Sequence, residues 1–87
     1  MKLGRLFWNE ANIEHIARHD VSPDEAEQVC RLQPKVRRGR DGRYLVLGRT
    51  AAGRYLLVVL TYLGHGEARV ITARDMDDKE RALYRRK

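Results

Sequence analysis

The sequence predicts an α+β domain in which two helices precede a four-stranded antiparallel meander and a third helix follows it. Two observations support this class. Helix-start signals with apolar residues at helical spacing occur in the first third of the chain and near its end. Between them lie alternating or apolar runs separated by glycine turns, which is typical of strands. At 87 residues the chain suffices for one domain, so we expect a single unit over residues 1–87.

Both N-terminal helices have a recognisable start. Asn9 can cap the first helix, whose apolar stripe consists of Ile13, Ile16 and Ala17. Ser22 begins the second, because Pro23 suits the first helical position and Glu25 can complete a capping box. We expect this second helix to run to about Leu32. Its buried face should consist of Ala26, Val29 and Cys30.

From Lys35 onward the pattern changes to that of strands. Asp41-Gly42 predicts a hairpin turn between strands at residues 35–40 and 43–49. The first of these carries three arginines and should lie at an edge of the sheet. Glycine turns bound a third strand over residues 54–63, which is apolar on both faces and therefore central. A fourth strand follows at residues 67–74, and Asp77 with Glu80 then starts the last helix.

The charge balance indicates a partner that carries negative charge. The net charge is +6 and the isoelectric point is near 10.0. Most of the basic residues are arginines, whose planar guanidinium binds phosphate through paired hydrogen bonds. An arginine-rich solvated surface explains the charge equally well. The single cysteine, Cys30, allows no internal disulfide, so a reducing cytoplasm is expected. We expect neither a signal peptide nor a membrane span.

Several side chains have both a structural and a chemical interpretation. His15 and His19 are four residues apart, as two metal ligands could be, but a third ligand is not evident and a solvated pair is favoured. Trp8 can pack at a helix start or stack on a base. Glu80 can serve its capping box, and Tyr84 can either pack or transfer a proton. We expect no metal and no cofactor.

The ordered motifs of the chain resemble those of the BrnT family of toxins. The first group consists of Trp8, Arg18-His19-Asp20-Val21, Ser22 and Asp24-Glu25-Ala26. The second group consists of Arg43, the run Leu56 to Val59, Thr72-Ala73-Arg74, Glu80-Arg81 and Tyr84. The match covers nearly the whole chain. Two departures are Asn9, where the family usually has aspartate, and Asp20, where glycine is common.

This resemblance implies a RelE-like fold and a ribonuclease toxin that is neutralised by a cognate antitoxin. Such an antitoxin is commonly a ribbon-helix-helix protein, through which the complex contacts operator DNA. The resemblance assigns phosphate stabilisation to Arg74, proton transfer to His19 and Tyr84, and orientation of an arginine to Glu80. Trp8 would shape the site. The residues that would hold the RNA backbone are Arg43, Arg54 and Arg69.

Cleavage of RNA without a metal needs a base, an acid and positive charge at the phosphorane, and the assigned residue types can supply all three. Strand parity predicts that Arg69 and Arg74 point to opposite faces of the sheet, unless the strand ends before Arg74. Two other functions remain open. The chain can be a basic nucleic-acid-binding module without catalysis, or a protein-interaction domain whose groove binds a partner helix.

Overall fold

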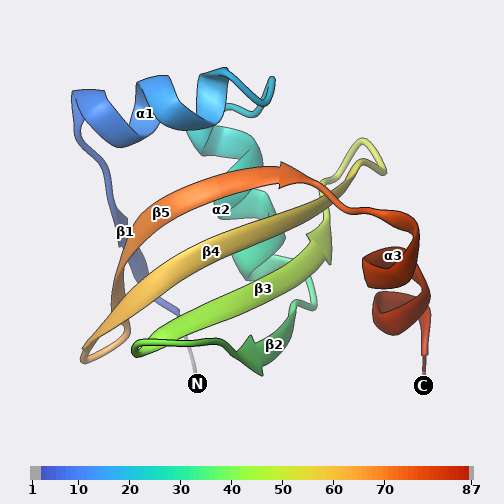
Figure 1. Cartoon of the computed structure of the whole chain (residues 1–87). Coiled ribbons are helices and arrows are strands. Elements are labelled where there is room, and N and C mark those ends of the chain that lie inside the picture. Colours follow the sequence, from blue (N-terminus) through green and yellow to red (C-terminus); the bar gives the residue numbers. More distant parts are fainter. Residues whose placement is uncertain (1–2, 87) are drawn as a thin grey trace.

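The computed structural model describes residues 3–86 and confirms the α+β class (Figure 1). The elements are β1 (Arg5–Phe7), α1 (Glu10–Ala17), α2 (Pro23–Arg31), β2 (Lys35–Arg38), β3 (Arg43–Arg49), β4 (Tyr55–Gly64), β5 (Glu67–Asp75) and α3 (Asp78–Arg85). The strands form one mixed sheet in the order β1-β5-β4-β3-β2. The predicted antiparallel meander is present as β2 to β5. In the described part of the chain, no helix is long and apolar enough to cross a membrane.

The strand β1 is the element that the sequence prediction missed, so the sheet has five strands and is mixed. β1 pairs in parallel with β5, with Leu6 opposite Ala68. The pairing begins just before the strand, where the Gly4 N–H donates to the Gly66 carbonyl at 2.7 Å. A strand of three residues is too short to show alternation, and its partner lies at the other end of the chain. Neither local periodicity nor turn chemistry could therefore reveal it.

The first helix begins where predicted but buries a different face. Asn9 caps α1, and Asn12 completes the capping box with its side chain. Of the predicted apolar stripe only Ile16 is buried, since Ile13 is 39% exposed and Ala17 is also exposed. Asn12 occupies the second buried position because its amide donates to the Val70 carbonyl of β5 at 3.1 Å. A hydrogen bond to the sheet thus decides which face α1 turns inward.

The second helix agrees with its prediction in start and buried face. Ser22 and Glu25 form the capping box of α2, with Pro23 in the first turn. The buried residues are Ala26, Val29 and Cys30. Burial raises the pKa of the Cys30 thiol to about 12.

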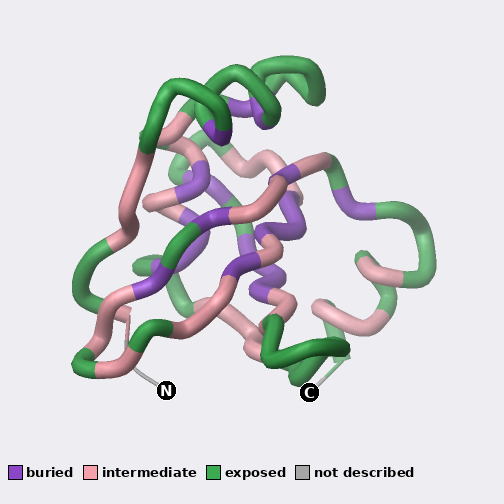
Figure 2. Tube along the Cα trace, turned by 60° about the vertical axis from the view of Figure 1, so that its left-hand side comes forward, coloured by how far each residue is buried: buried purple, intermediate pink, exposed green. Residues whose placement is uncertain are grey.

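The helices α1 and α2 cover one face of the sheet, whereas α3 lies against one end of the other face (Figure 1). The main core lies between the sheet and the first two helices, and the buried segments gather there in Figure 2. Ile16 and Val29 contribute from the helices, and Val58, Leu60 and Val70 from the central strands. A smaller core beneath α3 contains Leu47, Leu57 and Met76. β4 supplies both cores, which confirms its predicted central position.

The predicted hairpin and edge strand are also confirmed. Asp41 and Gly42 both have positive φ angles, 57° and 73°, and they lie in the tight turn that joins β2 to β3. β2 pairs only with β3 and is an edge of the sheet. Its strand conformation ends at Arg38, two residues before the predicted end, and Arg54 lies just before β4 rather than within it.

A β-bulge in β5 overturns the parity prediction for Arg69 and Arg74. Val59 pairs with Thr72 and the next residue of β4, Leu60, pairs with Val70, so Ile71 is an extra residue in β5. Arg69 lies opposite Thr61 and Arg74 opposite Leu57. Because Thr61 and Leu57 are four residues apart in one strand, both arginines point to the same face.

Candidate functional site

The sheet surface opposite α1 and α2 carries the arginine-rich candidate site, and we call it the open face. Strand register arranges its side chains in rows that cross the strands. The first row consists of Arg43, Thr61, Arg69 and Phe7. The second row consists of Arg37, Leu45, Val59 and Thr72. Arg37, Arg43 and Arg69 are exposed, and within residues 3–86 none of them forms an ion pair.

The row geometry explains what this surface can bind. Adjacent strands lie about 4.8 Å apart, so Arg43 and Arg69 are separated by about 10 Å across Thr61. Arg5 extends the positive charge toward β1, and its guanidinium carbon lies 4.8 Å from the centre of the Phe7 ring. A flat surface of guanidinium groups between small polar and apolar side chains suits a phosphodiester backbone with its sugars.

The third row consists of Lys35, Leu47, Leu57 and Arg74, and it lies where the open face meets α3. The terminal nitrogens Nη1 and Nη2 of Arg74 donate to the two carboxylate oxygens of Glu80, each at 2.8 Å. Nη1 also donates to the Asp75 carbonyl at 3.0 Å. These contacts use the Nη1–Nη2 end of the guanidinium and leave its Nε–H and one Nη2–H without a partner among the described residues. The Arg74 side chain is 40% exposed, so this free edge can bind a phosphate through two parallel hydrogen bonds.

Glu80 orients Arg74 and lies in the first turn of α3. The Glu80 carboxylate accepts the Asp77 N–H at 2.9 Å in the capping box of this helix. The hydrogen bond from Arg74 lowers the pKa of Glu80, and the same bond raises the pKa of Arg74. Both groups are therefore charged at neutral pH, and the guanidinium is fixed before a ligand arrives.

Tyr84 lies one helical turn beyond Glu80 on the same side of α3. Its ring meets Tyr55 edge-on at 6.0 Å and packs in the smaller core. The Tyr84 hydroxyl donates to the Gln33 carbonyl at 3.5 Å. At the same end of the helix, Lys35 donates to the carbonyls of Leu83 and Arg86 at 2.9 and 2.8 Å. Arg74 and Lys35 of the third row thus hold the two ends of α3.

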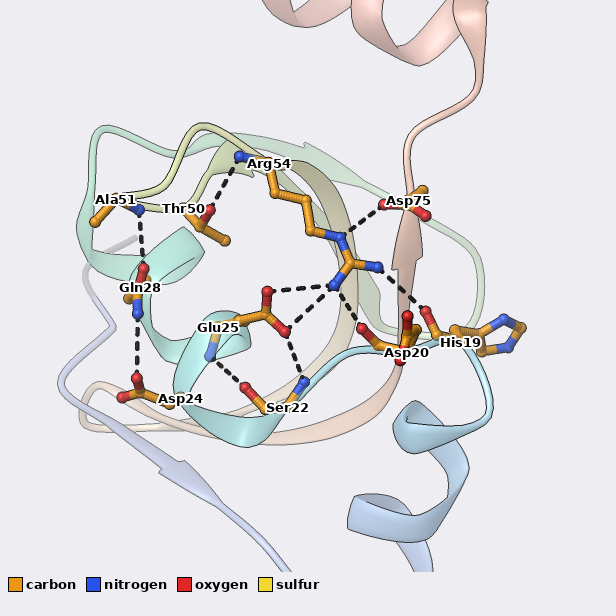
Figure 3. Close-up of polar contacts among 10 residues, drawn as sticks. All are labelled: His19, Asp20, Ser22, Asp24, Glu25, Gln28, Thr50, Ala51, Arg54 and Asp75. Atoms are coloured by element: carbon orange, nitrogen blue, oxygen red, sulfur yellow. Dashed lines mark hydrogen bonds and ion pairs between the residues drawn. The ribbon is translucent and has the colours of Figure 1, made fainter.

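Arg54 joins the helices to the sheet and points away from the open face (Figure 3). Its Nη1 donates to both carboxylate oxygens of Glu25, at 3.3 and 3.2 Å, and to the Asp20 carbonyl. Its Nε donates to Asp75 at 2.9 Å and its Nη2 to the His19 carbonyl at 3.3 Å. All three nitrogens are engaged, and the side chain is 27% exposed. This geometry describes a structural clamp between the α1–α2 corner, β4 and β5.

The electrostatics of the clamp agree with this geometry. The hydrogen bond to Asp75 is the main reason that the pKa of Arg54 is raised. The pKa of Glu25 is lowered, chiefly by the backbone N–H of Ser22 and then by Arg54. Glu25 thus serves its capping box and the clamp at once, and both interactions favour the charged carboxylate.

His19 lies on the helical side of the molecule and is not brought together with Arg74. Its carbonyl faces Arg54, whereas its ring is turned outward (Figure 3). The ring is exposed and meets His15 edge-on at 5.8 Å. Within residues 3–86, no group of three or more His, Cys, Asp or Glu side chains is arranged to hold a metal ion. His65 is exposed in the β4–β5 turn.

Trp8 also lies away from the open face. Its ring packs against the main core, and its Nε1–H donates to the Glu27 carboxylate of α2 at 3.1 Å. The structure therefore gathers Arg43, Arg69 and Arg74 on one surface, with Glu80 and Tyr84 on the helix that borders it. His19, Arg54 and Trp8 belong to the helical side.

Sequence reasoning missed three residues of the open face, which are Arg5, Phe7 and Arg37. Alternation within Lys35–Arg38 could have separated Arg37 from Val36, because successive residues of a strand point to opposite faces. Arg5 and Phe7 gave no such signal, since β1 itself was not recognised.

Comparison with known proteins finds a matching family model and similar solved structures. The family model described as the ribonuclease toxin BrnT of a type II toxin–antitoxin system matches residues 8–80. Among solved structures, the crystal structure of the Brucella abortus ribonuclease toxin BrnT is similar to this chain with a TM-score of 0.70. The similarity covers 85% of this chain and 97% of that one at 22% sequence identity, and it concerns the fold. A search of curated proteins found no match.

Proposed function

Because the chain belongs to the BrnT family of ribonuclease toxins from type II toxin–antitoxin systems, we propose that it cleaves RNA on its open face without a metal ion. The observation that carries this proposal is the free edge of Arg74, which is fixed by Glu80 beside a surface of unpaired arginines. Arg43 and Arg69 hold the RNA backbone in this proposal, together with Arg5 and Arg37.

The reaction we propose is attack by a ribose 2′ hydroxyl on the adjacent phosphorus. The bond from phosphorus to the 5′ oxygen breaks, which leaves a 2′,3′-cyclic phosphate and a free 5′ hydroxyl. Negative charge grows on the phosphorane oxygens, and the Nε–H and Nη2–H of Arg74 neutralise it through hydrogen bonds that strengthen in the transition state. Glu80 is a positioning residue, because it touches Arg74 rather than the RNA.

Two protons must move, one from the 2′ hydroxyl and one to the leaving 5′ oxygen. Tyr84 and His19 are the candidates for this work. Tyr84 belongs to the helix that carries Glu80, so RNA that lies along α3 meets Arg74 near the start of the helix and the phenol near its end. His19 lies across the Arg54 clamp, and RNA must pass around the end of β5 to reach its ring. The proposal therefore favours Tyr84 as the group that acts with Arg74.

The cellular setting that we propose follows the family. A cognate antitoxin, of the ribbon-helix-helix type, covers the toxin and brings the complex to operator DNA. Both proteins act in the cytoplasm, and residues 1–87 act as one unit. The net charge of +6 favours a partner with an acidic segment.

The test is to incubate the purified protein with end-labelled RNA in excess EDTA and to resolve the fragments and their ends. The comparison includes folded Arg74→Ala, Tyr84→Phe and His19→Ala variants, with Lys79→Ala as a surface control. We expect cyclic phosphate ends from the wild type and the control, loss of cleavage by about 100-fold or more in Arg74→Ala, and a strong loss in Tyr84→Phe. Intact RNA with all proteins would refute free ribonuclease activity. Full cleavage activity of Arg74→Ala would refute the assignment of Arg74 to the active site.

A binding function without catalysis predicts a different result. RNA affinity would fall steeply with salt, because phosphate contacts release counterions, but the RNA would stay intact. The same samples distinguish the two functions, since binding and cleavage are measured on one labelled RNA.

A further inference from the structure

Three arginines surround the Tyr55 ring on the side of α3 that faces away from the first row. The guanidinium carbon of Arg49 lies 4.8 Å from the ring centre, that of Arg81 at 4.5 Å and that of Arg85 at 5.9 Å. Arg49 comes from β3 and the other two from α3, where they are one turn apart. We call these four residues the Tyr55 cluster.

The three arginines of the Tyr55 cluster have no direct ion-pair partner within the described residues, and Asp75 is a carboxylate that lines a hollow together with Tyr55 and Arg81. Arg49, Arg81 and Arg85 are all exposed, and none of them forms an ion pair in residues 3–86. By contrast, Arg54 and Arg74 each have carboxylate partners. Like charges that converge on one ring repel one another, and an anion bound between them removes that repulsion. The stacked guanidinium groups keep their N–H edges free to bind it.

A surface hollow with a mixed polar and apolar lining adjoins the cluster. Its volume is about 430 Å³, and Arg49 and Tyr84 are among the residues that line it. The apolar part comes from Leu32, which is 45% exposed, and from Ala51. Arg49 belongs to both the cluster and the hollow, so the exposed leucine and the arginines lie on adjoining parts of one surface. This surface can accept one apolar side chain and several carboxylates from the same peptide.

The geometry favours a peptide over RNA at this place. The Tyr55 ring already contacts the guanidinium groups of Arg49 and Arg81 and the ring of Tyr84, so a base that stacks on it competes with these contacts. α3 also lies between the cluster and the first two rows of the open face, because Arg74 and Lys35 tie the helix to the third row while Arg81 and Arg85 lie over Tyr55, which pairs with Arg49 one row further along. A continuous phosphate track from the first row to the cluster is thus interrupted by the helix.

We propose that the Tyr55 cluster and its hollow bind an acidic segment of a protein partner, with carboxylates on the three arginines and an apolar side chain against Leu32. The identity of that partner as the antitoxin rests on the proposed function. A segment seated there covers Tyr84, which lines the hollow. Binding of the partner and access to the phenol then exclude each other, which gives a physical route to neutralisation.

The test uses two charge-matched triple variants. One replaces the cluster arginines, Arg49→Gln, Arg81→Gln and Arg85→Gln, and the other replaces three arginines of the open face, Arg37→Gln, Arg43→Gln and Arg69→Gln. One probe is a fluorescein-labelled glutamate-rich peptide that contains leucines. The other is a labelled 2′-O-methyl oligouridylate of equal charge, which cannot be cleaved. Anisotropy titrations of the wild type and both variants with the two probes give six affinities, and thermal unfolding checks that both variants fold.

We expect the cluster variant to lose peptide affinity by about tenfold or more while it keeps RNA affinity within about threefold. The open-face variant should show the reverse. Replacing the leucines of the peptide with serine should weaken its binding to the wild type. The proposal is overturned by unchanged peptide affinity in the cluster variant, by equal losses in both variants, or by a selective loss of RNA affinity. Failure of the wild type to cleave RNA would refute the proposed function and leave the peptide result intact.

Discussion

Replacing Arg54 with alanine removes a clamp that joins three parts of the fold. Hydrogen bonds to charged groups contribute about 1.5–3 kcal/mol when buried, and exposed ion pairs contribute about 0.2–1 kcal/mol. Asp75 is 66% exposed, so its bond to Arg54 belongs to the weak class. The Glu25 side chain is 30% exposed, so we assign its contact about 1 kcal/mol, and we assign the exposed contacts to the carbonyls of Asp20 and His19 about 0.5 kcal/mol each. The expected loss of unfolding free energy is about 2–3 kcal/mol.

The assay is thermal and urea unfolding followed by circular dichroism. For a domain of this size, the loss corresponds to a fall in Tm of about 10–20 °C. Arg43→Ala is the matched control, because it removes an exposed arginine without an ion pair and should change stability by about 0.5 kcal/mol or less. At a temperature where both variants are folded, only Arg43→Ala should weaken RNA binding. Unchanged stability of Arg54→Ala together with reduced RNA affinity would refute the clamp and assign Arg54 to RNA.

Three further outcomes are expected. Asp20→Gly should raise the unfolding free energy by up to about 1 kcal/mol, because Asp20 has a φ of 62° at the C-terminal corner of α1; a lower Tm would contradict this. Gly48→Ala should lower the unfolding free energy by about 1–3 kcal/mol, because the added Cβ would lie 3.0 Å from both the carbonyl oxygen and Cγ1 of Val29. An unchanged unfolding free energy in urea would contradict this steric clash. Arg74 lowers the pKa of Glu80 below its usual 4.5, so the wild type should have a higher Tm than Glu80→Gln at neutral pH. This difference in Tm should shrink as the pH falls below about 4.5, because the Glu80 carboxylate becomes protonated. A difference in Tm that stays constant with pH would exclude this linkage.

Local signals predicted most of the fold because their physics is local. Each of these signals depends on residues within about four positions of one another. Examples are the capping boxes at Ser22 and Asp77 and the hairpin turn at Asp41-Gly42. The inward face of α1 depends instead on a hydrogen bond from Asn12 to a strand at the other end of the chain. The pairing of β1 with β5 is likewise non-local. Periodicity in one segment does not report on either contact.

The candidate site shows the same division. Resemblance and charge indicated Arg43, Arg69 and Arg74 as site residues. Strand parity wrongly predicted that Arg69 and Arg74 point to opposite faces, because the sequence does not reveal the extra residue Ile71 in β5. The sequence also did not reveal that Arg54 has a structural role, because its hydrogen-bond partners lie in distant segments of the chain, at the α1–α2 corner and in β5. Asp20 is a partial exception. The family commonly has glycine at this position, and the positive φ of Asp20 supplies the physical reason.

The central claim is that RNA lies on the open face, with Arg74 at its border. The most direct measurement is an NMR titration of the ¹⁵N-labelled protein with a short 2′-O-methyl RNA, which binds without being cleaved. We predict that the largest shifts occur at the amides of Arg43, Thr61 and Arg69 and at the guanidinium Nε of Arg74, while α1 and α2 change little. Shifts confined to α1 and α2, around His19 and Trp8, would contradict the account.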